Sequence, residues 1–238
     1  MQTCTFVNCL FTYYKQWGPF LVVAPLSTLG HWQREFRAWT DLNVIVYHGS
    51  PSSRERIQEE EFDWLWTDDN HPRARTQRDL KELNANNFKW NVMITTPQVV
   101  NGDAKILDAT KIQWNTIIVD EAHSLKSNKS LFYKVLQTFK NPYSHVVFLT
   151  GTPIQNNMQE LWALLHFLDP DRFDDNERFV AKFANLAESR DELKEILSGR
   201  LLQRLKYLVE KSLGHRGEKI IWVELTLFQK KWYVFCVP

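Results

Sequence analysis

Five short apolar runs constrain the fold more than any other feature of this sequence. They are rich in β-branched residues and lie at residues 19–24, 43–47, 91–95, 116–120 and 145–150. Buried parallel strands have such continuous apolar patterns, whereas half-exposed strands alternate. Between the runs lie segments with helical spacing, such as Leu29, Trp32, Phe36 and Trp39. Strands that alternate with helices form right-handed βαβ units, so we expect an α/β fold with a mainly parallel sheet flanked by helices.

The second half of the sequence predicts mainly helix. Residues 156–168 place leucines on one helical face, and residues 179–208 have a helical pattern with a mixed-charge surface. A short strand is expected at Ile220–Leu225. We therefore expect a lobe at residues 1–170 followed by a helical C-terminal extension at 171–238.

Composition excludes some classes of protein. With 44% hydrophobic and 24% charged residues, the chain is typical of a globular protein. The net charge of +1 does not exclude a nucleic-acid partner, because nucleic-acid binding depends on a local basic stripe and not on the total charge. The three cysteines, Cys4, Cys9 and Cys236, lack the number and spacing of a disulfide framework or a zinc site, which fits a reducing cytosol or nucleus. No apolar stretch reaches the roughly 18 residues of a membrane span, so no membrane partner is expected.

Two adjacent carboxylates follow one of the apolar runs. Asp120 and Glu121 end the run that contains Ile117, and Thr150-Gly151-Thr152 ends the next one. Ligands bind at the carboxyl ends of parallel strands. An Asp there can hold Mg²⁺ through water, and the adjacent Glu can orient or deprotonate the water that attacks a γ-phosphate. The alternative is a carboxylate pair that caps the next helix.

A second part of such a site is missing from the sequence. Phosphate-binding loops have the form G-x-x-x-x-G-K-[ST]. None of the eight glycines is followed by Lys and Ser or Thr. The 238 residues therefore hold the carboxylates of a hydrolytic site without its phosphate cradle.

Hydroxyl groups at two expected helix starts are candidates for phosphate contact. A helix N-terminus offers unpaired backbone N–H groups to an anion, although ordinary N-caps use the same residues. A lysine after the carboxylates could meet phosphate or remain solvated. The candidates are Pro25, Ser27, Thr28, Thr95, Thr96 and Lys126.

Taken in order, these motifs resemble the first ATPase lobe of Swi/Snf-type chromatin remodellers, with the greatest likeness to the kismet-like branch of the chromodomain-helicase-DNA-binding group. The fold implied is a RecA-like lobe. Motifs that carry the resemblance are Phe20-Leu-Val-Val-Ala-Pro-Leu-Ser-Thr-Leu29, Trp32-Gln-Arg-Glu-Phe36, Val46-Tyr-His-Gly49, Asp120-Glu-Ala-His123, Leu149-Thr-Gly-Thr-Pro153 and Glu160-Leu-Trp-Ala-Leu-Leu-His-Phe-Leu168.

The resemblance implies roles for individual residues. ATP and Mg²⁺ are the cofactors expected of an intact family member, with weak or absent binding by this chain. Glu121 would be the base and Asp120 the water-mediated Mg²⁺ ligand of the Walker B (DEAH) wall. The residues that would bind ATP or couple it to DNA are His123, Thr150, Gly151, Thr152 and Gln155. His123 could instead be a core histidine. The helix starts after Pro25 and at Thr96 would grip one DNA strand.

The resemblance also implies a truncated protein. In the family, the Walker A loop precedes a segment similar to Met1-Gln-Thr-Cys-Thr-Phe6, and a second lobe follows the region that ends here. We expect a nuclear fragment of an ATP-dependent DNA translocase that contacts double-stranded DNA or nucleosomes and is inactive alone. This chain has Ser124 and Ser127 at positions where the family usually has Arg and Asn. These differences argue against normal coupling between the two lobes.

Two other functions fit the same sequence. A non-catalytic interaction fragment would have lost its ATP chemistry, and a DEAH-type RNA helicase would share the carboxylates. Trp32-Gln-Arg-Glu-Phe36 and Leu164-Leu-His-Phe-Leu168 favour a remodeller over an RNA helicase. We expect Trp32, Trp39 and Trp162 in the core, because they fall on apolar helical faces.

Overall fold

The structure is a computed structural model that describes residues 1–62, 88–109, 112–125, 127–141, 144–151, 158–183, 186–204 and 217–236. The chain divides into two compact units, Met1–Ser189 and Arg190–Pro238. The sequence predicted the end of the lobe at residue 170, so the first unit extends beyond the expected boundary. The charged, weakly periodic sequence at residues 59–87 predicts a surface excursion, most of which lies outside the described residues.

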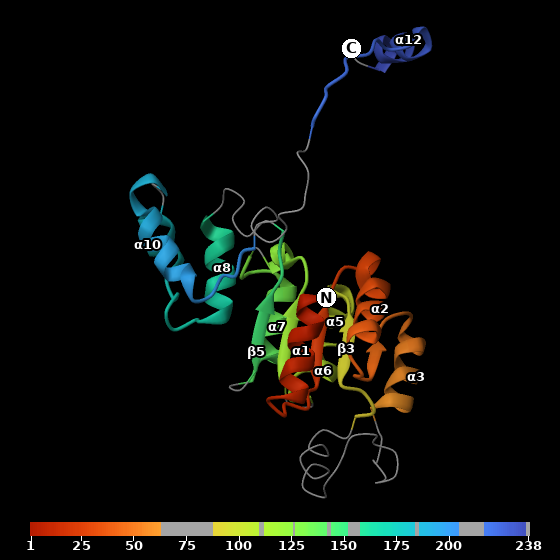
Figure 1. The fold of residues 1–238 in the computed structure, drawn as a ribbon, viewed down its shortest axis with the longest axis vertical. Coiled ribbons are helices and arrows are strands. Elements are labelled where there is room, and N and C mark those ends of the chain that lie inside the picture. Colours follow the sequence, from red (N-terminus) through yellow and green to blue (C-terminus); the bar gives the residue numbers. More distant parts are fainter. Residues whose placement is uncertain are drawn as a thin grey trace, which may run out of the picture. The chain divides into compact units, whose positions relative to one another are not determined.

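A five-stranded parallel sheet forms the centre of the first unit (Figure 1). Its strand order is β2-β3-β1-β4-β5. The strands are β1 (Phe20–Val23), β2 (Val44–Val46), β3 (Val92–Thr95), β4 (Thr116–Val119) and β5 (His145–Phe148). Every described pairing is parallel, with Val23 level with Thr95 on one side and Val119 on the other. The structure confirms the predicted α/β fold and all five strands within the lobe, with slightly shorter bounds.

The central strands are buried on both faces. Alternate side chains of a strand point to opposite faces of a sheet. Phe20 and Val22 pack with apolar residues of α1 (Gln2–Thr12) and α2 (Leu29–Trp39). Leu21 and Val23 belong to a second cluster on the other face. This arrangement explains why the strand sequences are continuous apolar runs.

Short helices line the second face of the sheet. They are α3 (Pro51–Glu61), α5 (Pro97–Gly102), α6 (Ala104–Leu107) and α7 (Leu131–Phe139). Helix α7 presents Phe132, Leu136 and Phe139 to the core, and Ser130 caps its start by accepting the N–H of Tyr133. The spacing of these apolar residues matches one face of an α-helix.

Two further helices lie in the described part of the first unit, together with the start of α10. They are α8 (Met158–Leu168), close to the helix predicted at 156–168, and α9 (Asn176–Lys182). Lys140 donates from Nζ to the carbonyl oxygens of Phe167 and Leu168, which lack partners within the helix end. Trp162 is 4% exposed, as predicted for a core residue, whereas Trp39 is 51% exposed and the core prediction for it is wrong.

The C-terminal part differs from the sequence prediction. Helix α10 (Leu186–Ser198) crosses into the second unit, and residues 199–204 are irregular, so the helix predicted at 179–208 is divided and shorter. The strand predicted at Ile220–Leu225 is wrong, since residues 217–226 are irregular and pair with no described strand. Helix α12 (Leu227–Cys236) follows and was not predicted. No helix among the described residues is long and apolar enough to cross a membrane.

Candidate functional site

The sheet topology brings several predicted site residues to one edge. Parallel strands place their carboxyl ends at the same edge of a sheet. Along that edge the strand ends follow the order β3, β1, β4, β5, which places Thr95, Pro25, Asp120 and Thr150 in neighbouring positions. Each of these four positions lies at or just beyond the end of its strand.

A tight turn at the end of β4 positions the two carboxylates. The backbone N–H of Asp120 donates to Val23 O at 2.8 Å, and that of Ala122 donates to Leu149 O at 2.9 Å. Between these anchors Glu121 has φ of 51°, in the left-handed region. This conformation costs a non-glycine residue about 1–2 kcal/mol. The turn therefore holds the Glu121 backbone in a strained geometry, with its side chain 48% exposed.

The carboxylate of Asp120 accepts a hydrogen bond at each oxygen. The backbone N–H of Glu121 donates to Oδ1 at 3.0 Å, and the indole Nε1–H of Trp32 donates to Oδ2 at 2.8 Å. Neither donor is a backbone N–H of the first turn of the helix that follows. The Asp120 carboxylate therefore does not cap that helix. The short 3₁₀-helix that follows is η3 (Ala122–Leu125).

His123 lies beside the glutamate and outside the core. Its side chain is 51% exposed, and its Nδ1 lies 3.1 Å from Oε2 of Glu121. The core-histidine alternative is therefore wrong. Thr150 is half-buried and Gly151 is exposed, directly after β5. Lys126, Thr152 and Gln155 lie outside the described residues.

The start of α2 is exposed at the end of β1. Ser27 is exposed, and Pro25 and Thr28 are half-buried. The hydroxyl of Thr28 donates to Pro25 O at 2.9 Å, and no side chain caps α2, so the N-cap expected from Ser27 or Thr28 is wrong. Short 3₁₀-helix η1 (Leu26–Thr28) leads into α2 instead.

The end of β3 is closed to a ligand. Thr95 is 0% exposed, and its hydroxyl donates to Tyr47 O at 2.8 Å. Thr96 is 1% exposed and caps α5 by accepting the N–H of Val99. Side chains with so little exposed surface do not reach a phosphate group in this conformation. The phosphate contacts predicted for Thr95 and Thr96 are therefore incompatible with this geometry.

Sequence reasoning missed a buried polar cluster next to Thr95. Arg54 on α3 binds Asp103 with two hydrogen bonds, from Nε to Oδ2 at 2.7 Å and from Nη2 to Oδ1 at 3.0 Å. Tyr47 also donates to Asp103, at 2.6 Å. Burial raises the pKa of Asp103, but the hydrogen bonds from Arg54 and Tyr47 outweigh it and leave the pKa below its ordinary value. The cluster joins α3 to the segment between α5 and α6, and residues 49 positions apart give no local sequence signal for it.

The carboxylates at the end of β4 suit a metal ion that protein groups coordinate only in part. No group of three or more potential ligands from His, Cys, Asp and Glu occurs within the described part of the chain. Mg²⁺ typically uses one or two carboxylates, water and substrate phosphate oxygens in place of an all-protein cage. An ionised carboxylate has about four lone-pair sites, and the two donors to Asp120 leave others for a bound water. Asp120 therefore suits a water-mediated Mg²⁺ ion.

Comparison with known proteins identifies the family of this chain. The model of the SNF2-related domain matches residues 1–237. The chain belongs to the SNF2-related family. Among curated relatives it is 42% identical to human chromodomain-helicase-DNA-binding protein 6 over 98% of its length, and 43% identical to human chromodomain-helicase-DNA-binding protein 7 over 91%. These matches cover only 8% and 7% of the two relatives.

Comparison with solved structures identifies a protein of the same family. The SWI2/SNF2 ATPase core of Sulfolobus solfataricus, solved in complex with double-stranded DNA, matches with a TM-score of 0.62 and 25% identity. The match covers 88% of this chain and 38% of that one. This likeness confirms the predicted RecA-like fold and the resemblance to Swi/Snf-type proteins.

Proposed function

We propose that this chain supplies the DEAH wall of the ATP site, and part of the DNA-contacting face, of an ATP-dependent DNA translocase of the chromatin-remodelling type that acts in the nucleus. The observation that carries the proposal is the turn at the end of β4, where Asp120 is held at both oxygens and Glu121 is held at φ of 51°. Membership of the SNF2-related family supports it.

Each residue of the turn has a role in hydrolysis. Asp120 would hold Mg²⁺ through water, and this ion would neutralise charge on the phosphate oxygens. Glu121 would orient or deprotonate the attacking water, because it directly follows Asp120 in the turn and its side chain is 48% exposed. His123, 3.1 Å from Glu121, would restrict the glutamate rotamer. Thr150 and Gly151, with Thr152 and Gln155, would link this site to DNA.

The DNA-contacting face would include the start of α2. Ser27 is exposed there, beside backbone N–H groups that no side chain caps. Such groups contact phosphate oxygens without reading bases. The solved SWI2/SNF2 core was obtained with double-stranded DNA, which supports duplex or nucleosomal DNA as the partner. Thr95 and Thr96 lie outside this face, since both are buried.

One sequence feature favours a second candidate, a non-catalytic interaction fragment. The 238 residues contain no Gly-Lys-Ser/Thr, so backbone groups that would hold the β- and γ-phosphates are not supplied by these residues. Measured ATP binding separates the candidates. Binding that depends on Mg²⁺ and is weakened by Asp120→Asn supports the DEAH wall. Absence of binding supports the interaction fragment once a Gly-Lys-Thr loop and a second lobe are supplied, because the chain alone lacks the phosphate cradle.

We expect the chain alone to show no DNA-stimulated ATP hydrolysis. Phosphoryl transfer needs positioning and charge neutralisation of the phosphates, and one wall of a site does not provide both. Phosphate release, with and without duplex DNA, measures this directly. Clear turnover that Glu121→Gln abolishes would contradict the prediction that the second wall must come from elsewhere.

Substitution of Ser27 tests the DNA-contacting face. Ser27→Glu places an anion against the phosphate backbone and should weaken duplex binding roughly tenfold at low salt and less at high salt, because salt screens exposed charges. Thr138→Glu is the matched control, since Thr138 is an exposed hydroxyl residue near the end of α7. Titration of labelled duplex at two salt concentrations gives the affinities. Equal affinities for the two variants would remove α2 from the DNA face.

A further inference from the structure

We propose that Trp32 is a positioning residue for the metal-binding carboxylate of Asp120. The inference rests on the proposed function, because it assumes that Asp120 holds a metal ion. Trp32 lies on α2 and Asp120 follows β4, 88 positions later in the sequence. The apolar spacing of α2 predicted a core position for Trp32, yet its indole N–H is directed at Asp120, the candidate metal ligand.

The contact has the geometry of a good hydrogen bond. The indole Nε1 of Trp32 lies 2.8 Å from Oδ2 of Asp120, at the short end of N–H···O distances. A charged acceptor strengthens such a bond. The site is half-buried, so water competes less with the indole than it would at an open surface. The indole therefore determines where one oxygen of the carboxylate points.

Both partners of the bond are anchored independently. The Trp32 ring packs near Phe36, with centroids 6.0 Å apart, and Phe36 is fully buried one turn later on α2. Asp120 is anchored through its backbone, which donates to Val23 O at 2.8 Å. Val23 ends β1, the strand that leads through η1 into α2. The indole and the carboxylate thus meet on a framework made by two adjacent strands.

The two hydrogen bonds restrict the carboxylate in a way that neither does alone. The terminal torsion of Asp is broad and intrinsically permits many carboxylate orientations. Glu121 N–H fixes Oδ1 and Trp32 fixes Oδ2, so rotation would break at least one bond. The lone pairs that remain then point in set directions toward a metal-bound water. Hydrogen bonds to ligating carboxylates commonly have this role.

An indole is suited to this role by its chemistry. Its Nε1–H is a donor only, so it neither ligates a cation nor accepts a proton. A lysine or arginine at the same place would bring a positive charge that repels Mg²⁺. Trp32 therefore orients Asp120 without competing for the metal ion or for the proton of the attacking water.

The first test is the indole region of a ¹H–¹⁵N NMR spectrum of the labelled chain, which has 10 tryptophans. Trp32→Phe removes one indole signal and thereby assigns it. Asp120→Asn removes the negative charge at the acceptor and should move the Trp32 signal more than any other indole signal. Trp39 is the internal control, because it lies on the same helix and is 51% exposed.

The second test measures positioning with Mn²⁺, a paramagnetic substitute for Mg²⁺. The readout is the Mn²⁺ concentration that half-broadens the backbone amide signal of Ala122. Trp32→Phe keeps an aromatic ring against Phe36 and removes the N–H, and it should raise this concentration about tenfold, as loss of a hydrogen bond to a metal ligand does. Trp39→Phe, the matched control, should leave it unchanged.

The outcomes separate this inference from the proposed function. An unchanged Mn²⁺ midpoint in Trp32→Phe, with clear broadening of Ala122 in the wild type, would overturn the role of Trp32 and leave the metal role of Asp120 intact. No Mn²⁺ effect at Ala122 in the wild type would overturn the metal role and the inference with it. If the chemical shift of the Trp32 indole signal is unchanged in Asp120→Asn, the hydrogen bond itself is contradicted. A higher midpoint in Trp32→Phe alone supports the inference.

Discussion

The ends of β3 and β4 lie at the same edge of the sheet but differ in their surroundings. At the end of β3, Thr95 and Thr96 are buried, and their hydroxyls bind Tyr47 and the N–H of Val99. At the end of β4, Glu121 is 48% exposed and has a left-handed backbone. Sequence patterns predicted ligand-binding residues at both ends. Only the end of β4 presents polar groups to a ligand.

The difference separates polar residues that complete the fold from those that we propose act on a ligand. The hydroxyls at β3 complete the hydrogen bonding of buried backbone groups, as folded proteins require. The carboxylates at β4 are placed in a strained turn by backbone bonds to Val23 and Leu149. Strained backbone of this kind persists where the surrounding structure fixes it, often at functional sites. Substitutions at the two ends should therefore act on different properties.

The largest effect is expected for Thr95→Glu. It would bury a carboxylate at a position with 0% exposure and remove the bond to Tyr47 O, which should destabilise the fold by more than about 4 kcal/mol. Glu121→Gln at the exposed end of β4 should change stability by less than about 1 kcal/mol. Urea unfolding measures both. Similar stabilities for the two variants would erase the distinction between the strand ends.

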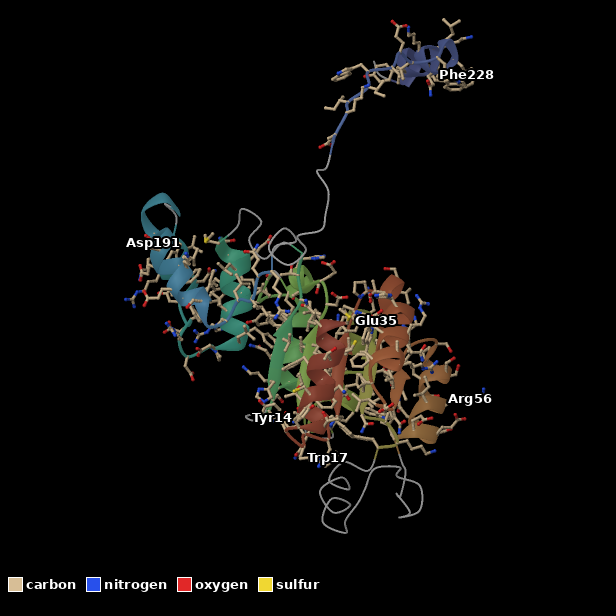
Figure 2. The ribbon with its side chains drawn as sticks, viewed as in Figure 1. Tyr14, Trp17, Glu35, Arg56, Asp191 and Phe228 are labelled. Atoms are coloured by element: carbon tan, nitrogen blue, oxygen red, sulfur yellow. The ribbon has the colours of Figure 1, made fainter. Side chains whose placement is uncertain are left out.

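A smaller effect is expected for the cluster that supports Thr95. Arg54→Gln leaves Asp103 buried without its guanidinium partner and should cost about 3 kcal/mol at neutral pH. Arg56→Gln is the control, because Arg56 lies on the same helix with its side chain directed outward (Figure 2). Equal unfolding midpoints for the two variants would show that the cluster contributes nothing to stability.

The same cluster gives a pH dependence. The folded pKa of Asp103 lies below its ordinary value, so the folded state binds the proton more weakly than the unfolded state. This contribution to stability is present above the ordinary pKa of about 4 and is lost as pH falls through the lower folded pKa. Unfolding free energies measured from pH 6 down to about pH 2 should decline less steeply in Asp103→Asn than in the wild type. Parallel curves would contradict this assignment.

The smallest effect concerns the strained turn at Glu121. Glu121→Gly and Glu121→Ala both remove the carboxylate, but only glycine adopts a positive φ without strain. At φ of 51° the glycine variant should be more stable than the alanine variant by about 1 kcal/mol. The difference between their unfolding free energies in urea measures the cost of the positive φ at this position. Equal stabilities would show that the turn relaxes when the carboxylate is removed.

The fold within the lobe was largely predictable because its signals are local. Continuous apolar runs identified β1, β3 and β4, whose residues are buried on both faces. The apolar run at Ile220–Leu225 carried the same signal but has no strand partner among the described residues. Strand formation depends on pairing and burial, which an isolated apolar run does not encode.

The site was predictable only in part, because burial and long-range contacts decide it. The motif at Asp120-Glu-Ala-His123 identified the carboxylates, and the parallel topology explains their place beside β1 and β5. Burial of Thr95 depends on Tyr47, 48 positions away, and the bond between Trp32 and Asp120 spans 88 positions. A prediction that β1 pairs with β4 would also have predicted that α2 lies close to Asp120.

We propose that Glu121 acts on the attacking water while Asp120 holds the metal ion. The most direct test is a chimera in which this chain replaces the matching segment of human chromodomain-helicase-DNA-binding protein 6, with ATP binding and DNA-stimulated turnover measured on the same samples. Glu121→Gln should leave ATP binding nearly unchanged and reduce turnover by roughly 10²- to 10⁴-fold, the usual contribution of a general base. Asp120→Asn should also weaken Mg²⁺-dependent binding. Small and equal losses from both substitutions would contradict the account.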